Sequence, residues 1–95
     1  MLTYASEFIG TFILVLAILV AKNEPTKPLY IGLALVVAII LVSGLGGMAH
    51  LNPVVTIVQM QRGQCPTETA SCLMLMQLLG AAAATVLVPS CTEGR

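Results

Sequence analysis

Charged side chains are scarce in this sequence: they make up 8% of its 95 residues, and four Lys and Arg balance four Asp and Glu. A chain without an excess of cations has no basic face for nucleic acid, so we expect no such partner. Its hydrophobic content of 58% lies well above that of soluble domains. The length allows one domain at most. The composition therefore predicts a small integral membrane protein.

Paired cysteines and clustered metal ligands are lacking as well. The three cysteines are odd in number, and no ligand spacing connects Cys65, Cys72 and Cys91. We interpret them as small hydrophobic residues or free thiols. His50 has no Cys, Asp or second His near it, so we interpret it as a hydrogen-bonded loop histidine rather than a metal ligand or general base. We expect no cofactor, no metal and no enzymatic activity.

Three apolar segments are long enough to cross a bilayer as helices. The first runs from about residue 4 to 21, the second from about 29 to 44, and the third from about 67 to 88. Pro89 is expected to close the third segment, and residues 89–95 follow as a polar tail. The chain is therefore predicted to be a multi-pass membrane protein.

Residues 45–63 interrupt this pattern and predict a different element. The glycine-rich start leaves few backbone amides in regular structure, and we expect residues 44–50 to be non-helical. Asn52 is a good N-cap and Pro53 suits the first helical position, whereas Gly63 ends the helix. About 10 helical residues span roughly 15 Å, half of a hydrocarbon core. The predicted fold is all-α, with three transmembrane helices and a re-entrant half-helix.

Three motifs on these segments resemble signatures of the aquaporin, or major intrinsic protein, family. Residues 50–56 read His-Leu-Asn-Pro-Val-Val-Thr, where the family usually has His-Leu-Asn-Pro-Ala-Val-Thr. Residues 7–12 resemble the Glu-Phe-x-Gly-Thr-Phe opening of its first helix, and residues 77–81 resemble the Gln-x-x-Gly-Ala of its third. The resemblance covers only the first half of a family member, so we expect residues 1–95 to form one aquaporin-like half-repeat of an inverted pair.

The resemblance implies a channel for passive transport of water, and equally of small neutral solutes such as glycerol. The Asn52 amide supplies two N–H donors at the positive end of the half-helix dipole. A water molecule there would present its oxygen to Asn52, which opposes a proton-conducting chain of waters. The carbonyls before Asn52 would form a row of acceptors. The expected pore residues are Gly47, Met48, Ala49, His50, Asn52, Pro53 and Val54.

Two polar side chains within the spans, Glu7 and Gln77, call for partners because a carboxylate in a membrane is costly. The resemblance implies that both brace the re-entrant loop, with the Glu7 carboxylate bonded to N–H groups around residues 48–51. The alternative places Glu7 at the membrane interface, facing water. The filter position that the family's second helix provides falls near Ile31 or Gly32, and the family's selectivity arginine has no counterpart. Water and glycerol selectivity are therefore equally open.

Three spans put the two ends of the chain on opposite sides of a membrane. A tandem copy would therefore cross the membrane in the inverted orientation. We expect either an antiparallel homo-oligomer or a missing second half from a longer channel. Val54 stands where the family has alanine and adds bulk where two half-helices meet. The alternatives are a non-conducting fragment or membrane partner of a complete channel, and a small dual-topology exporter. The expected partners are membrane lipids and water or small neutral solutes.

Overall fold

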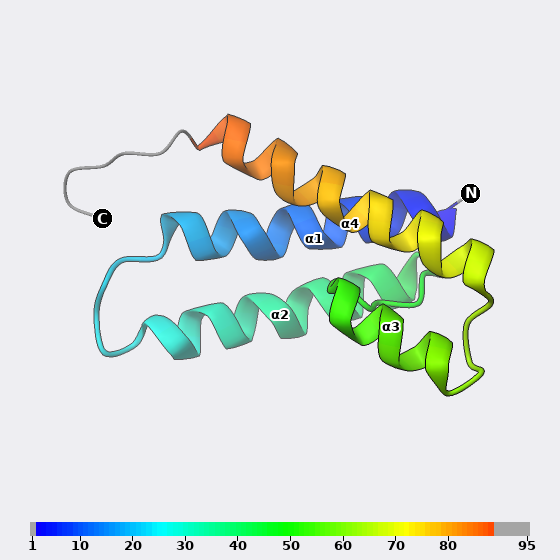
Figure 1. The fold of residues 1–95 in the computed structure, drawn as a ribbon. Helices are drawn as coiled ribbons and strands as arrows, with labels where there is room; N and C mark the ends of the chain where they lie inside the picture. Colours follow the sequence, from blue (N-terminus) through cyan, green and yellow to red (C-terminus); the bar gives the residue numbers. More distant parts are fainter. Residues whose placement is uncertain (1, 89–95) are drawn as a thin grey trace.

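The computed structural model describes residues 2–88, which contain four helices and no strand (Figure 1). These helices are α1 (Leu2–Val20), α2 (Lys27–Gly44), α3 (Pro53–Gln61) and α4 (Thr67–Leu87). Three of them, α1, α2 and α4, are long and apolar enough to cross a membrane. The predicted all-α membrane fold is confirmed. The expectations for Pro89, Cys91 and the tail over residues 89–95 lie outside the described residues.

Local chemistry explains where the helices begin and end. Pro28 occupies the first turn of α2, where its missing N–H costs nothing. The Asn52 side chain accepts a hydrogen bond from the Val54 N–H and caps α3, as its N-cap position predicts. One expectation is wrong by a residue: Gly44 is still helical, because the N–H of Leu45 bonds back to the carbonyls of Leu41 and Val42. The irregular loop begins at Leu45 instead.

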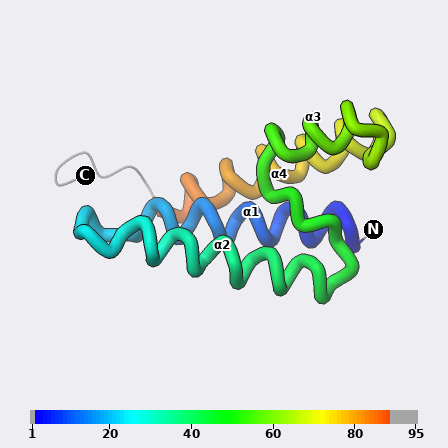
Figure 2. Tube along the Cα trace, turned by 90° about the horizontal axis from the view of Figure 1, so that it is seen from below, coloured from blue at the N-terminus to red at the C-terminus, as the bar shows by residue number. Residues whose placement is uncertain are grey.

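Helix α1 is the central element, with α4 and α2 packed against it, while α3 lies against α4 (Figure 2). The backbones of α1 and α4 approach closely at Gly80, where an added Cβ would lie 2.5 Å from the Phe8 carbonyl oxygen. Small residues permit such a close approach of helices in membrane proteins. Residues 80–84 of α4 are a run of small residues, one glycine and four alanines. Gly80 and Ala84 are buried on this side of α4.

The interior of the fold is unusually polar, and its outer surface is apolar. Only Ala38 and Val42 of α2 are buried, so most of its large hydrophobic side chains face outward. In contrast, several polar side chains are enclosed: Ser6, Glu7, Thr11, Thr56 and Gln77. An apolar exterior suits lipid, and enclosed polar groups need partners within the protein. Ser6, Glu7, Thr56 and Gln77 gather around the loop between α2 and α3, whereas the Thr11 hydroxyl has no hydrogen-bond partner within residues 2–88.

Candidate functional site

The loop of residues 45–52 passes directly against α1. The N–H of Gly47 donates to the Val42 carbonyl at 2.9 Å, which folds the chain back after α2. A Cβ at Gly47 would overlap the Ser6 hydroxyl and would lie 2.7 Å from a Val42 methyl group. A larger residue at this position would therefore force the Ser6 and Val42 side chains to shift.

Three residues of this loop have a positive φ, and two of them are not glycine. Gly46 has φ +85°, while Ala49 and Leu51 have φ of 59° and 60°. Left-handed geometry costs a non-glycine residue roughly 1–2 kcal/mol. Such strain persists only where the surrounding structure holds it, and it gathers at functional sites. The segment on either side of His50 is therefore held in place by contacts beyond its own sequence.

Glu7 supplies the strongest of these contacts. Its Oε2 accepts from the His50 N–H at 2.8 Å, and its Oε1 accepts from the Leu51 N–H at 2.9 Å. Successive backbone N–H groups in an alternating backbone form a concave site for an anion, and this carboxylate fills it. Glu7 is 0% exposed. The expected hydrogen bonds to the loop are therefore present, and the alternative placement at a water-facing interface is wrong.

Gln77 extends the network from α4. Its Nε2 donates to Glu7 Oε1 at 3.2 Å and to Thr56 Oγ1 at 2.9 Å. The amide orientation follows from these neighbours, because a rotated amide would set its oxygen against the carboxylate. Gln77 reaches the half-helix and Glu7, whereas the resemblance implied a direct bond to the loop. Its Oε1 is buried and accepts no hydrogen bond from residues 2–88.

Thr56 links Gln77 to His50, and sequence reasoning missed it. Its hydroxyl lies 2.8 Å from His50 Nδ1 and 3.4 Å from the Asn52 carbonyl oxygen. A hydroxyl has one proton to donate, and the shorter contact favours Nδ1 as the acceptor. We assign the histidine proton to Nε2 on this basis. Thr56 follows Asn52 by four residues, which places the two on the same face of the helix. This spacing was the signal in the sequence that could have pointed to Thr56.

Asn52 stands at the exposed tip of α3. Its Oδ1 is occupied by the Val54 N–H at 2.8 Å, which fixes the direction of the side-chain amide. Its Nδ2 donates to no group within residues 2–88, so both of its N–H bonds are available. Pro53 forms the first turn beside it, and the Val54 side chain is 64% exposed.

The loop carbonyls are equally available. Within the described part of the chain, no donor bonds to the carbonyl oxygens of Gly47, Met48, Ala49 or His50. Backbone acceptors without partners are tolerated at membrane depth only where they meet protein or water.

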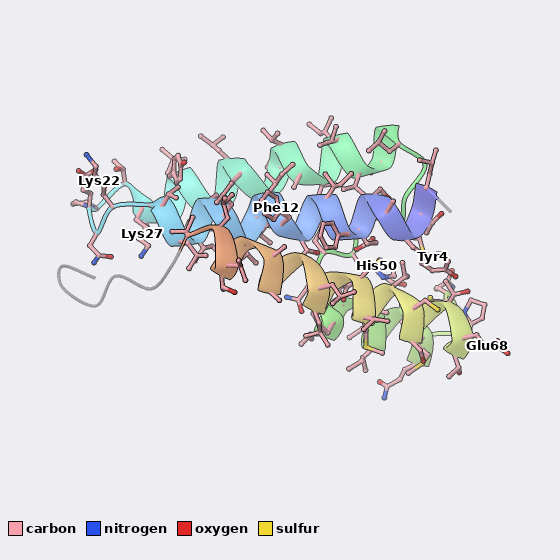
Figure 3. The ribbon with its side chains drawn as sticks, turned by 90° about the horizontal axis from the view of Figure 1, so that it is seen from above. Tyr4, Phe12, Lys22, Lys27, His50 and Glu68 are labelled. Carbon is pink, nitrogen blue, oxygen red and sulfur yellow. The ribbon has the colours of Figure 1, made fainter. Side chains whose placement is uncertain are left out.

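Figure 3 shows His50 between the end that carries Lys22 and Lys27 and the end that carries Tyr4 and Glu68.

The two expected filter positions lie apart from this cluster. Ile31 and Gly32 line a cavity of about 750 Å³ together with the turn between α1 and α2. No residue of the loop before α3 lines that cavity. The structure therefore brings together Glu7, Gln77, His50 and Asn52, but it does not bring Ile31 or Gly32 to them.

Three membrane-spanning helices around an inward loop define a multi-pass integral membrane protein. The model of the family described as Major intrinsic protein matches residues 3–95. The chain belongs to the major intrinsic protein family, whose members are transport channels rather than enzymes. No curated protein and no solved structure gave a match to the chain.

Proposed function

We propose that this chain lines one half of a pore for water and small neutral solutes such as glycerol. The observation that carries the proposal is that, within residues 2–88, the carbonyl oxygens of Gly47 to His50 accept no hydrogen bond and the Asn52 amide N–H groups that follow donate none. Acceptors along one wall and donors at the tip of a half-helix match the hydrogen-bonding needs of water and of hydroxyl groups.

The charge distribution supports exclusion of ions and protons. The N-terminus of α3 carries the positive end of the helix dipole beside Asn52. This potential opposes cations, and donation from Asn52 to the oxygen of a passing water opposes a proton relay. The Glu7 carboxylate, which is hydrogen-bonded to the loop, already accepts three N–H bonds within residues 2–88 and is shielded from solvent.

A second half-repeat completes the pore in this proposal, with residues 1–95 acting as one repeat. A lone copy would leave the carbonyl row and the tip of α3 facing lipid, where each unpaired group costs on the order of 1–3 kcal/mol. The second half is either an antiparallel copy of this chain or a following repeat. In both arrangements, Val54 and Pro53 meet the opposing half-helix.

Substituting Asn52 with aspartate tests the pore. Aspartate caps a helix as well as asparagine does, so α3 should persist. The new carboxylate has acceptors where the amide had donors, and the loss of one hydrogen bond of about 1 kcal/mol to the passing water predicts a roughly fivefold fall in water permeability. We also expect a cation or proton leak. Stopped-flow light scattering of proteoliposomes measures the first, and a pH-sensitive dye measures the second.

The matched control is Asn23→Asp, because Asn23 is exposed in the turn between α1 and α2. Unchanged water flux and no leak in Asn52→Asp would show that Asn52 does not face the path. If the unmodified chain gives no water flux and co-purifies with a complete channel, the pore proposal is wrong and the chain is a non-conducting partner of that channel.

Cross-linking of Val54→Cys tests the antiparallel arrangement, in a background that lacks the native cysteines. Disulfide formation requires Cβ atoms about 3.5–4.5 Å apart, so thiols at two touching tips should pair efficiently. Val58→Cys is the control, because Val58 is 45% exposed on the same helix but one turn farther from the tip. Pairing at residue 54 alone, with terminal tags on both membrane faces, is the expected result. A single orientation without pairing would leave a following repeat as the second half.

A further inference from the structure

Two buried polar atoms, one on α1 and one on α4, are left over from the network around the loop. The Thr11 hydroxyl and Gln77 Oε1 have no hydrogen-bond partner within residues 2–88, although the two side chains are only 4% and 1% exposed. Burial of a polar group without a partner is costly, and folded proteins pair nearly all such groups with protein or with ordered water. Each of these two atoms therefore requires a partner.

The two atoms belong to neighbouring turns of packed helices. Thr11 follows Glu7 by four residues, which places both residues on the same face of α1. Gln77 Nε2 donates to Glu7 Oε1 at 3.2 Å, and Gly80, one turn farther along α4, lies against the Phe8 carbonyl of α1. The turn of α4 from Gln77 to Gly80 therefore packs on the part of α1 that carries Thr11.

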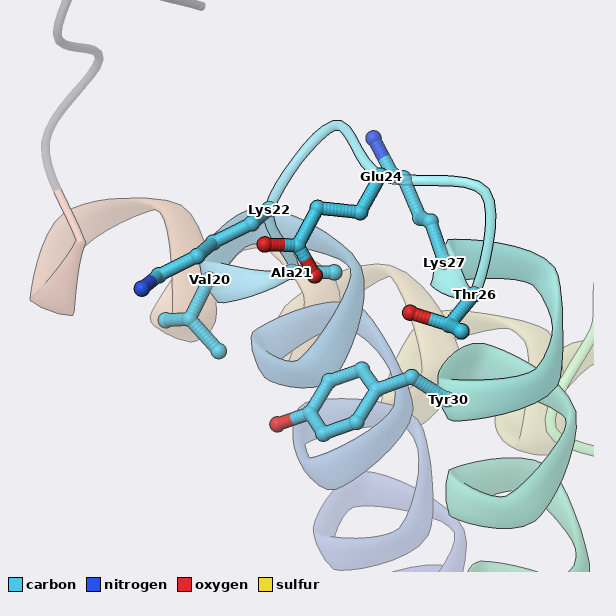
Figure 4. A pocket seen from close by; sticks show the side chains of 7 residues that line it. All are labelled: Val20, Ala21, Lys22, Glu24, Thr26, Lys27 and Tyr30. Atoms are coloured by element: carbon cyan, nitrogen blue, oxygen red, sulfur yellow. The ribbon is translucent and has the colours of Figure 1, made fainter.

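A group from outside the chain cannot supply the missing bonds. Both atoms are enclosed by residues 2–88 themselves, so a side chain of an opposing half-repeat has no access to them. The polar side chains at the turn between α1 and α2 differ in this respect. Lys22 and Glu24 line a cavity there and are exposed, so solvent can hydrate them (Figure 4). A partner for the two enclosed atoms must be as small as a water molecule.

One water molecule has both the reach and the chemistry to bond the two atoms. Thr11 lies one turn, about 6 Å, beyond the level at which Gln77 meets Glu7. Two hydrogen bonds of about 2.8 Å in series cover nearly this distance. Gln77 Oε1 can only accept, the Thr11 hydroxyl can donate, and water does both. A water that accepts from Thr11 can therefore donate to Gln77.

We propose that the Thr11 hydroxyl and Gln77 Oε1 bind one ordered water molecule between α1 and α4. The water gives each of these buried atoms a partner. A donor on Oε1 also fixes the orientation of the Gln77 amide, whose Nε2 then faces Glu7 and Thr56. The water therefore completes the network that holds the loop before α3. This site is independent of whether the chain conducts.

Replacing Thr11 with valine tests the site, because valine keeps the shape of the side chain and removes the hydroxyl. For the unmodified full chain in detergent micelles, we expect a nuclear Overhauser signal between water and the Thr11 methyl group. In Thr11→Val the water loses one protein partner, so the folding equilibrium constant should fall about fivefold. The NMR signal of the Gln77 side-chain carbonyl carbon should shift as well. Thr11→Ser keeps the hydroxyl and should retain that carbonyl signal.

Thr85→Val is the matched control, because Thr85 is exposed on α4 and its hydroxyl donates to the Ala82 carbonyl at 2.7 Å. This variant should leave the Gln77 carbonyl signal unchanged. Lack of a water signal at Thr11 would overturn the proposal. Greater stability of Thr11→Val would also overturn it, since removal of a hydroxyl buried without a partner is stabilising. An unchanged Gln77 carbonyl signal in Thr11→Val would show that the two atoms share no water, and would overturn it too.

Discussion

Replacing Glu7 with glutamine is expected to release the loop before α3 and to destabilise the fold by about 2–4 kcal/mol. The carboxylate accepts from the His50 N–H, the Leu51 N–H and Gln77 Nε2 in a fully buried position. An amide has one acceptor oxygen, so its NH₂ group would face a buried donor. The left-handed residues Ala49 and Leu51 would then lose the contact that offsets their strain.

Glu68→Gln is the matched control, because Glu68 is exposed in the first turn of α4. Its loss should cost no more than about 1 kcal/mol through the helix dipole. Denaturant unfolding in detergent micelles measures the stability, and hydrogen exchange at residues 47–51 measures release of the loop. Equal stability and equal exchange in Glu7→Gln and the unmodified chain would show that the loop is held by other contacts.

The substitution Gly80→Val is expected to separate α1 from α4 and to cost about 3 kcal/mol or more. A Cβ at Gly80 would lie 2.5 Å from the Phe8 carbonyl oxygen and 3.2 Å from the Phe12 nitrogen. These are backbone atoms, which cannot rotate away as a side chain does. The helices must therefore move apart, and Gln77, one turn earlier on α4, would be carried away from Glu7.

Ala82→Val controls for the β-branched side chain in a helix, because Ala82 is exposed two residues farther along α4. Thermal unfolding of the two variants in the same detergent separates the effects. The stability of Gly10→Ala should lie between those of the two valine variants, because a Cβ at residue 10 would meet side-chain atoms of Val42 and Leu51 rather than backbone atoms. Similar stability for Gly80→Val and Ala82→Val would refute the close helix crossing.

Much of the fold and part of the site could be predicted from the sequence, because local chemistry decides them. Long apolar segments give spans whatever surrounds them, and Asn52 with Pro53 starts a helix through its own side chain and fixed φ. The need of Glu7 for donors followed from the cost of a carboxylate inside a span. Membership in the major intrinsic protein family agrees with the three motifs.

Other features depend on residues that are distant in the chain, and no local pattern predicts them. Ala49 and Leu51 take positive φ although neither is glycine, because Glu7 holds the N–H groups on this segment. Thr56 joins the network only because α4 delivers Gln77 beside it. Glycine at residue 44 predicts a loop from residue type alone. Gly44 is nevertheless helical, because the last turn of α2 has carbonyls that accept from the N–H of Leu45.

The wide separation along the chain between Glu7 and its donors has a consequence for biosynthesis. The N–H groups of His50 and Leu51 lie 43 and 44 residues downstream, and Gln77 lies 70 residues downstream. When α1 first enters the membrane, none of these donors has been inserted, and an unpaired carboxylate in a span is unfavourable. We therefore expect Glu7 to gain two of its partners when the loop before α3 enters the membrane, and the third only when α4 has followed.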